Sequence, residues 1–408
     1  MDDPHAHPSS SRAHVSGCST TTKKSHKKKK REITNGLNAE PIATLTVPPV
    51  DGPNVAIRDP KYIGSYNWVD SPSPTILVPG SPRIWRNKPT PFTIRHDTGN
   101  HFCDQNGYRL PSTPLLPILV AVDKMVVRSD VSPISIDWPS VDYITDRNGL
   151  RKLLEWVSGK KQSFRIDLQL AGKKTVLCNR WEPQSRLKVF DGYGYNFEDA
   201  VTSAAPGCER SSGGHHRVIT YDLCGLTMVV RFEVDACHVP HDAPSTSTDF
   251  LSAQLASMAL SKSTTSTHTV DQRTSLTVIS TGKPIPNESV IELTTRKGND
   301  SGIRLRNKYP QLYFSQTPEL IIGLHHNGRF TDVQRKTMES LTSLEDSLQR
   351  RLGALGQALS DIQDLVVQSG TEGRLSLVGR DKELLVFERV STASCLPETY
   401  LKRFVASG

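Results

Sequence analysis

Two carboxylates occupy alternate positions in one predicted strand. Residues 229–235 read Val-Val-Arg-Phe-Glu-Val-Asp, so apolar residues surround Glu233 and Asp235. Because the side chains of a strand alternate between its two faces, both carboxylates are expected to project from the same face. Two like charges on one face are costly unless a cation or a basic group lies beside them. The pair therefore indicates a candidate cation site.

A third carboxylate, Glu292, stands in another predicted strand. Residues 290–294 read Val-Ile-Glu-Leu-Thr, which is a similarly apolar setting. Carboxylates gathered from adjacent strand ends are typical of nucleases, which hold Mg²⁺ through oxygen ligands and retained waters. Acidic pairs also occur on exposed strand faces, where they have only a structural role. The spacing alone leaves both interpretations open.

The hydrophobic pattern predicts strands and helices that would position these groups in an α+β fold. Alternation and β-branched residues predict strands over residues 141–145, 164–170, 174–178, 218–221, 227–234, 290–295, 319–324, 375–378 and 384–387. Leucines at helical spacing predict a helix over 149–157, and a short helix is expected after Pro397. Apolar residues three and four apart predict one long amphipathic helix over 333–368, with a break near Gly353 and Gly356. Packing on the chain's own sheet is favoured over a coiled-coil partner.

Composition divides the chain into a tail and one domain. Residues 1–60 are polar and aperiodic, which predicts a disordered basic tail, and residues 61–405 are predicted to form a single domain. A Ser/Thr-rich stretch over 241–286 is typical of a surface insertion. The net charge of the chain is +8, and seven of its basic residues lie between Lys23 and Arg31. The remaining chain is therefore near neutrality.

The basic run has two functional interpretations. It contains five consecutive cationic residues: Lys27, Lys28, Lys29, Lys30 and Arg31. Such a run is typical of a nuclear import signal or of an arm that binds nucleic acid, and a solvated charge run is the structural alternative. We expect a nuclear protein, or otherwise a cytoplasmic one.

Other composition features exclude several classes. The seven cysteines are scattered without a C-x-x-C pair, which favours a reducing compartment. No apolar signal segment or membrane-length stretch is present, so neither secretion nor a membrane location is expected. Cys237, His238 and His241 lack a complementary zinc-binding half, and these histidines, like His215 and His216, are predicted to lie in loops or on the surface.

Six short blocks follow one another in the order found in one family. They are residues 146–154 (D-R-N-G-L-R-K-L-L), residues 192–198 (G-Y-G-Y-N-F-E), residues 217–235 ending in F-E-V-D, residues 291–295 (I-E-L-T-T), Tyr309-Pro310-Gln311 with Pro318 and Gly323, and residues 396–400 (L-P-E-T-Y). They resemble the R-G-x-L-x-K-L-L, G-Y-K-F-E, G-E-V-D, E-L-K-T, W-x-Q and L-P-x-x-Y segments of the DXO family of RNA 5′-end decapping and exonuclease enzymes. The resemblance spans residues 141–402 outside the insertion.

This resemblance implies a fold, a set of site residues and a substrate. The fold would be of the PD-(D/E)XK nuclease type, a central mixed β-sheet flanked by helices. The implied ligands for Mg²⁺ or Mn²⁺ are Glu198, Glu233, Asp235 and Glu292, and the last three are also implied to be catalytic. The implied substrate contacts are Arg147, Arg217 and Gln311. The implied partners are RNA 5′ ends, with a 5′-3′ exonuclease as a candidate protein partner.

One departure from the family pattern bears on activity. Thr294 stands where the family has a lysine that orients the attacking water and stabilises phosphorane charge. Loss of such a donor costs a factor on the order of 10²–10³ in rate. Strand alternation puts Arg296 on the face of Thr294, so Arg296 is the predicted substitute, ahead of Lys297. The sequence thus supports two hypotheses, a metal-dependent hydrolase of RNA 5′ ends and an inactive member that binds RNA ends or a protein.

A divergent fungal group resembles the chain more closely still. Some of its members bear the name geranylgeranyl pyrophosphate synthetase. That chemistry needs paired D-D-x-x-D helices to bind Mg²⁺-diphosphate, and no D-D-x-x-D occurs in the sequence. We therefore expect no prenyl-transfer activity.

Overall fold

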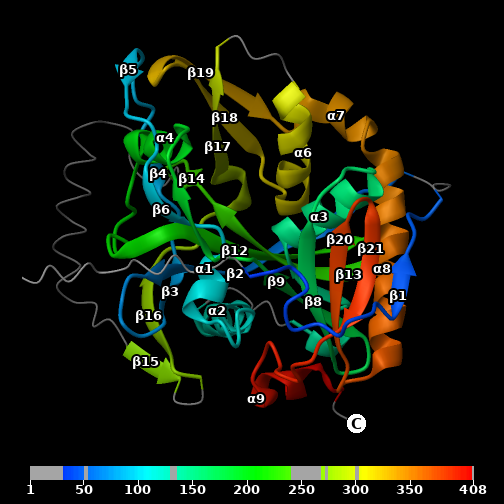
Figure 1. Ribbon diagram of the computed structural model, residues 1–408. Helices are drawn as coiled ribbons and strands as arrows, with labels where there is room; N and C mark the ends of the chain where they lie inside the picture. Colours follow the sequence, from blue (N-terminus) through cyan, green and yellow to red (C-terminus); the bar gives the residue numbers. More distant parts are fainter. Residues whose placement is uncertain are drawn as a thin grey trace, which may run out of the picture.

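The computed structural model describes residues 31–49, 54–128, 136–239, 268–271, 274–298 and 303–406. Two large β-sheets and the helices packed on them make up this part of the chain (Figure 1). None of its helices is long and apolar enough to cross a membrane.

The larger sheet contains twelve strands among the described residues. Their order across the sheet is β1 (Ala43–Leu45), β21 (Glu383–Glu388), β20 (Arg374–Arg380), β8 (Phe164–Ala171), β9 (Thr175–Trp181), β7 (Tyr143–Asp146), β13 (Leu226–Val234), β12 (Ser211–Leu223), β2 (Ile57–Val69), β3 (Thr75–Gly80), β16 (Leu276–Gly282) and β15 (His268–Asp271). The pairs β7–β9, β7–β13 and β3–β16 are parallel, and the other neighbours are antiparallel. The sheet is therefore mixed, as predicted.

A second sheet of seven described strands lies beside the first. Its order is β11 (Thr202–Ser203), β4 (Ile84–Trp85), β14 (Ala236–Cys237), β17 (Val290–Lys297), β18 (Glu319–His326), β19 (Arg329–Thr337) and β5 (Phe92–Thr93). A small ribbon pairs β6 (Gly99–Phe102) with β10 (Arg186–Val189). Because β14 follows β13 after one residue, the chain passes from the large sheet directly into the smaller one.

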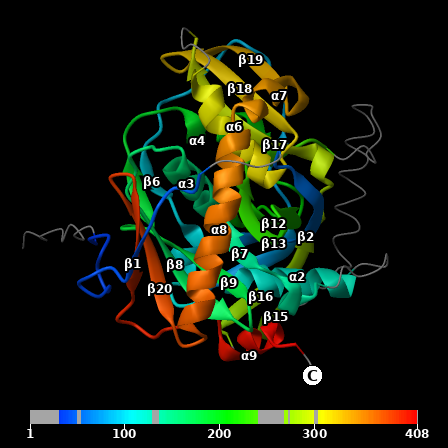
Figure 2. The same cartoon turned by 90° about the vertical axis from the view of Figure 1, so that its right-hand side faces the viewer.

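Helices cover both faces of the large sheet. The α-helices are α1 (Gln105–Arg109), α2 (Leu116–Arg128), α3 (Arg147–Val157), α4 (Gly194–Val201), α6 (Ile303–Ser315), α7 (Thr342–Asp346), α8 (Gln349–Ser369) and α9 (Glu398–Leu401). Short 3-10 helices are η1 (Trp138–Ser140), η2 (Asn287–Ser289), η3 (Glu339–Leu341) and η4 (Lys402–Phe404). Figure 2 shows α8 running along one face of the sheet, with α2 beside another part of it.

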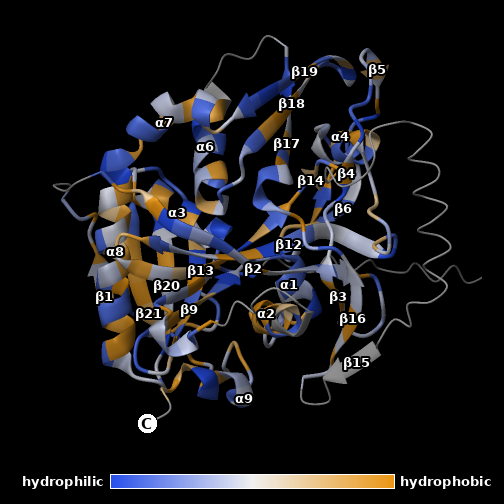
Figure 3. Ribbon diagram, turned by 180° about the vertical axis from the view of Figure 1, so that it is seen from behind, coloured by the Kyte–Doolittle hydropathy of each residue, from blue (hydrophilic) through white to orange (hydrophobic). Residues whose placement is uncertain are grey.

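The core is divided by the sheets into layers. Residues of α3, α6 and α8 pack with Met228, Val230 and Phe232 of β13 on one face of the large sheet. The intervening Val229 packs on the opposite face against α2, which is largely hydrophobic (Figure 3). A smaller cluster packs α4 on the second sheet. The α+β fold class predicted from the sequence, a mixed sheet flanked by helices, is confirmed.

Three pairs of consecutive predicted strands form hairpins in the large sheet. β8 pairs antiparallel with β9, β12 with β13, and β20 with β21. The β12–β13 hairpin turns at Cys224 and Gly225, whose φ angles of 58° and 82° are both left-handed. Two such residues match the right-handed twist of the flanking strands, which explains the tight turn.

The structure describes the chain from residue 31, before the predicted boundary at residue 60. Residues 1–30, which are half of the predicted tail, lie outside the described residues. After them, β1 pairs with β21 at the sheet edge, and Arg165 Nη1 donates to the carbonyls of Ile33 at 3.1 Å and Asn35 at 2.7 Å. These contacts use backbone groups of a polar segment, so composition could not reveal them.

The Ser/Thr-rich insertion is shorter than the predicted 241–286. Residues 240–267 lie outside the described residues, but β15 and β16 follow them. β16 pairs in parallel with β3, and Leu276 and Val278 are buried. Thr and Val fit a pleated surface, so this Ser/Thr-rich stretch extends the large sheet instead of forming a surface loop.

The predicted helix over 333–368 is three separate elements after a strand. Residues up to Thr337 belong to β19, which pairs with β18 through Val333 opposite Gly323. η3 and α7 follow, and the helix proper is α8. It continues through Gly353 and Gly356 without a break. Glycine is needed at position 356, because a Cβ there would meet Cys224 Sγ at 2.4 Å. Gly356 thus permits close packing on the β12–β13 turn and does not break the helix.

Candidate active site at the junction of the two sheets

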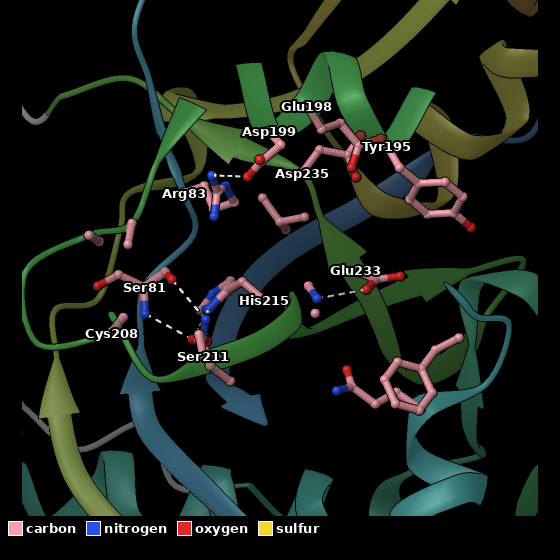
Figure 4. A pocket seen from close by; sticks show the side chains of 18 of the residues that line it. Ser81, Arg83, Tyr195, Glu198, Asp199, Cys208, Ser211, His215, Glu233 and Asp235 are labelled. Atoms are coloured by element: carbon pink, nitrogen blue, oxygen red, sulfur yellow. Dashed lines mark hydrogen bonds and ion pairs between the residues drawn. The ribbon is translucent and has the colours of Figure 1, made fainter. Parts of the chain in front are cut away.

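Three of the four predicted carboxylates line one open cavity of about 410 Å³. Glu198 belongs to α4, Glu233 lies near the end of β13, and Asp235 joins β13 to β14. Figure 4 shows Glu198 and Asp235 directed toward the same part of the cavity, with Glu233 farther along its wall. The cavity therefore opens where the chain passes from one sheet to the other.

Two neighbours hold α4 so that Glu198 reaches the cavity. The Asp97 carboxylate caps the helix by accepting hydrogen bonds from the backbone N–H of Tyr195 at 3.2 Å and of Asn196 at 2.9 Å. A carboxylate at this end also interacts favourably with the helix dipole. On the sheet side, Phe197 is fully buried and stacks on Phe330 with centroids 4.8 Å apart.

Glu198 and Asp235 repel one another inside the protein. Burial raises the pKa of Glu198 well above its usual value, and the charges of Asp235 and Glu233 raise it further. Burial also raises the pKa of Asp235, with Glu292 as the next cause, against a hydrogen bond from the Leu293 N–H at 2.7 Å. Crowded carboxylates of this kind are stabilised in the ionised form by a cation placed between them.

Glu233 is held by the neighbouring strand. Its Oε1 accepts a hydrogen bond from the Gly214 N–H at 3.1 Å. A Cβ at position 214 would lie 2.0 Å from the same oxygen, so only glycine allows this approach. Burial raises the pKa of Glu233, and the charges of Arg147 and Arg180 act in the opposite direction.

Glu292 lies behind the cavity and is only 3% exposed. Arg147 Nη1 donates to its Oε2 at 3.2 Å, and Lys308 Nζ lies 3.4 Å from its Oε1. Gln311 Nε2 donates to the same Oε1. The structure thus brings the predicted residues Arg147 and Gln311 together at Glu292.

A second cavity, of about 150 Å³, adjoins the first. Its basic lining residues are Arg147, Arg151, Arg180 and Arg231, and Glu233 lines both cavities. Arg231 is neutralised by Asp146, with Nε 2.6 Å from Oδ1. The pKa of Arg151 is lowered by burial and by the like charge of Arg147. An arginine-lined cavity therefore stands beside the carboxylate-lined one.

The start of α3 adds to the positive character of the second cavity. Asp146, Arg147 and Asn148 line it, and the Asp146 carboxylate binds Arg231 instead of capping the helix. The first backbone N–H groups of a helix carry partial positive charge and favour anions when no side chain caps them. The cavity combines two sources of attraction for a phosphate group.

The oxygen donors of the first cavity fit a divalent cation in their chemistry. Mg²⁺ in phosphate-transferring sites is often bound by one or two carboxylates, with waters and substrate phosphates as the other ligands. Glu198 and Asp235 form such a pair. Among the described residues, no group of three or more His, Cys, Asp or Glu side chains lies close enough together to hold a metal ion. The match to a divalent-cation site is therefore one of donor chemistry, with two carboxylates in one cavity.

Two predicted site residues lie elsewhere. Arg296 lines neither cavity, and its buried Nε makes no hydrogen bond within the described part of the chain. Arg217 also lines neither; it is 1% exposed, stacks on Tyr62 at 4.0 Å and donates to the Ile285 carbonyl at 2.7 Å. Arg296, expected as a catalytic residue, and Arg217, expected as a substrate contact, are therefore both outside the lining of the two cavities.

The histidine pair differs from the prediction of surface or loop positions. His215 and His216 are buried in β12. His215 Nδ1 hydrogen-bonds Asn67 Oδ1 at 2.8 Å, and His216 stacks on Tyr66 with centroids 4.9 Å apart. Groups of adjacent strands surround both histidines, and the charges of Arg231 and Asp146 act on His216, so these polar residues are interior although composition predicted the surface.

Three basic residues of the site were missed by sequence reasoning. Lys308, Arg151 and Arg180 belong to α6, α3 and β9. Lys308 is three residues before Gln311, and in a helix this spacing places both side chains on one face. A helix predicted over this segment would therefore have indicated Lys308 as a site residue. Arg151 is likewise four residues after Arg147. Arg180 carries no comparable signal, because only the sheet order brings β9 to this place.

Comparison with solved structures identifies the fold. Candida albicans Rai1 in complex with pU5 and Mn²⁺ is 14% identical, with a TM-score of 0.56 over 89% of this chain and 99% of that one. Scheffersomyces stipitis Rai1 with (3′-NADP)⁺ and calcium is 13% identical, with a TM-score of 0.57 over the same shares, 89% and 99%. S. pombe Rai1 with 3′-FADP is 13% identical, with a TM-score of 0.54 over 84% and 96%. At these identities the likeness establishes the nuclease-like fold that was predicted.

Sequence comparison gives the family. No protein of curated function matches the chain. Nothing in the comparisons supports the geranylgeranyl pyrophosphate synthetase name. The sequence model of one family, described as a domain of unknown function (DUF8563), matches residues 42–404, and the chain belongs to that family.

Proposed function

We propose that this protein hydrolyses RNA at its 5′ end with the help of a divalent metal ion. The observation that carries the proposal is the pairing of two cavities that share Glu233, one lined by carboxylates and one by arginines. A cation site beside an anion site is the arrangement that a phosphate-cleaving centre needs. The fold shared with Rai1, one example of which is in complex with pU5 and Mn²⁺, also supports it.

Each group of residues has a distinct task in this proposal. Glu198 and Asp235 would hold Mg²⁺ or Mn²⁺, and a bound ion would lower the pKa of its water. Arg147 and Arg151 attract the terminal phosphate of the RNA, because guanidinium groups match phosphate oxygens. Glu233 lines both cavities, so it would lie beside the bound cation and beside the bound phosphate.

A second candidate is a protein that binds RNA ends without cleaving them. Two observations favour it. Thr294 cannot supply the charge of the lysine that the family resemblance expects, and Glu292 is already engaged by Arg147, Lys308 and Gln311. In that case the arginine-lined cavity would keep its affinity for phosphate while turnover is lost.

Incubation of the purified protein with defined RNAs separates the two candidates. The substrates are 5′-monophosphate, 5′-triphosphate, capped and 5′-hydroxyl RNA, each with Mg²⁺ or Mn²⁺. The proposal expects metal-dependent cleavage that starts at the 5′ end. Asp235→Asn is expected to lower the rate by at least about 100-fold, because it removes one of two charged ligands from the cation site.

A matched acidic variant serves as the control. Glu383→Gln changes an exposed carboxylate at the start of β21 and should leave the rate unchanged. RNA binding without cleavage in the wild-type protein would establish the second candidate. Cleavage that persists in Asp235→Asn would contradict the assignment of the carboxylate cavity as the active site.

We also propose a nuclear location, on the strength of the basic run that ends at Arg31. Lys27–Lys30 lie outside the described residues, and Arg31 lies at the surface, where its guanidinium stacks over Trp181 at 5.3 Å. Runs of consecutive Lys and Arg residues are typical of nuclear import signals.

A further inference from the structure

The family resemblance leaves the site without its expected cation. The residue two positions after Glu292 is Thr294, whose hydroxyl cannot neutralise charge on a phosphate. Arg296 is two residues farther along β17, which adds about 6–7 Å at the rise of a strand. Arg296 lines neither cavity, and its buried Nε makes no hydrogen bond within the described residues. Lys308, on another element, lines neither cavity either, but it is ion-paired with Glu292.

Lys308 of α6 reaches the same carboxylates from the opposite direction. Its Nζ lies 3.4 Å from Glu292 Oε1, the oxygen that also accepts from Gln311 one helical turn later. Its charge also acts on Glu198 and Asp235, lowering the pKa of each. One amine thus lies close to both the buried carboxylate and the pair that lines the cavity.

Lys308 differs from the nearby arginines in its freedom to move. Arg147 is held by Glu292 and Ser315 and stacks on Phe232 at 5.5 Å, and its side chain is 11% exposed. The Lys308 side chain is 31% exposed and has one ion-pair partner among the described residues. A four-carbon stem with a single contact lets the amine turn from Glu292 toward a phosphate that enters the cavity.

We propose that Lys308 is the catalytic cation of this protein, delivered from α6 to the reacting phosphate in place of a lysine at position 294. The assignment rests on the proposed function. In the hydrolysis, a water oxygen forms a bond to phosphorus, and the bond from phosphorus to the leaving oxygen breaks. The water loses one proton to solvent, and the leaving oxygen takes one from solvent. Lys308 stabilises the negative charge that develops on the phosphate oxygens and keeps its own protons throughout.

A lysine exchange tests this assignment. Lys308→Met keeps the length of the stem without the charge, and it is expected to lower kcat by about 10²–10³-fold. The affinity for 5′-phosphorylated RNA in Ca²⁺, measured by fluorescence anisotropy, should stay within about threefold, because the arginine-lined cavity is intact. Lys308→Arg keeps the charge and should retain more activity than Lys308→Met.

The rescue is the decisive measurement. The double variant Thr294→Lys with Lys308→Met returns an amine to the same face of β17 as Glu292. It should recover at least about tenfold in kcat over Lys308→Met alone. A merely structural role of Lys308 would predict no such recovery, because position 294 lies on a different element.

Controls separate failure of this assignment from failure of the proposed function. Arg306→Gln removes an exposed cation from the same helix and should leave kcat unchanged. A wild-type protein that cleaves no RNA end overturns both. An active wild type with an equally active Lys308→Met, or with no recovery in the double variant, overturns only the role of Lys308.

Discussion

His216 is a neutral side chain enclosed by charged groups. Its pKa is lowered to about 3, mainly by burial and next by the charge of Arg231, while Asp146 and the Gly214 backbone act in the opposite direction. The charged groups that face it are Arg231 and Asp146, which pair with each other at 2.6 Å, and Glu233 is its cross-strand neighbour. His215, the adjacent residue, also has a lowered pKa, mainly because of burial.

Because of His216, we expect the free energy of unfolding to decrease in mild acid. An unfolded histidine binds a proton below about pH 6.5, whereas folded His216 stays neutral down to about pH 3. Its contribution is therefore complete above pH 6.5 and is lost progressively as the pH falls from 6.5 toward 3. At pH 5 the free energy of unfolding should be lower by about 2 kcal/mol from this residue alone.

Urea unfolding at pH 7.5 and pH 5 measures the effect. His216→Phe keeps an aromatic ring against Tyr66 and should reduce the difference between the two pH values. His326→Gln changes an exposed histidine at the end of β18 and should leave the difference unaltered. An equal pH dependence in wild type and His216→Phe would show that other groups control acid stability.

At the scale of single residues, the sequence indicated the acidic residues of the candidate site better than its basic residues. Glu198, Glu233 and Asp235 stand in short motifs beside strands, where alternation and resemblance both apply. Lys308 was missed because α6, the helix that places it on the same face as Gln311, was not recognised in the sequence. The expected substitute Arg296 shares a strand face with Thr294, but the extra length of strand carries it away from the cavity.

At the scale of elements, α4 depends on a glycine of the strand beneath it. Gly323 in β18 faces Phe197, and an added Cβ would lie 2.5 Å from Phe197 Cε2 and 2.7 Å from Phe330 Cε1. Both rings are fully buried, so neither can move away freely. The close contact between α4 and β18 is what sets the height of Glu198 above the second sheet.

Gly323→Ala should therefore weaken the fold and the site together. The added methyl group overpacks the Phe197–Phe330 contact, and the free energy of unfolding should fall by about 1–3 kcal/mol. Gly298→Ala is the control, because a Cβ there meets nothing within 4 Å, and a change within about 0.5 kcal/mol is expected. Thermal and urea unfolding measure both. A Gly323→Ala protein as stable as the control would show that α4 adjusts easily.

The strand pairing also explains why the hydrophobic periodicity gave a wrong prediction for one segment. In residues 333–337 the apolar spacing fits a helix, but this segment forms the end of β19, because pairing with β18 satisfies its backbone. Long-range pairing of this kind overrides local preference. The hairpins β8–β9 and β12–β13 were predictable because each is closed by a short local turn.

At the scale of the whole molecule, the excess positive charge is concentrated in one stretch of the sequence. Seven of the basic groups behind the net charge of +8 lie between Lys23 and Arg31. Under the proposed function, the rest of the chain, which is near neutrality, would attract RNA through local arginine clusters. The basic run and the arginine clusters can therefore be tested one at a time.

Replacement of Lys27 to Arg31 by glutamine should abolish nuclear accumulation of a fluorescent fusion. The reason is that an import receptor binds consecutive Lys and Arg side chains, which glutamine would replace with neutral groups. Live-cell imaging of the nuclear-to-cytoplasmic ratio measures the effect. A variant with glutamine at five exposed lysines, Lys61, Lys173, Lys283, Lys382 and Lys402, controls for the change in net charge. An unchanged ratio together with weaker RNA binding would instead identify the run as a nucleic-acid arm.

The crossing of the chain from β13 to β14 has a consequence for biosynthesis. The proposed site draws on α4, the β13–β14 crossing, β17 and α6, so its parts emerge from the ribosome at separate times. An unfinished chain that ends before β17 lacks Glu292 and all of α6. Under the proposed function, such a nascent or prematurely terminated product would carry no complete site and would not cleave the transcripts around the translating ribosome.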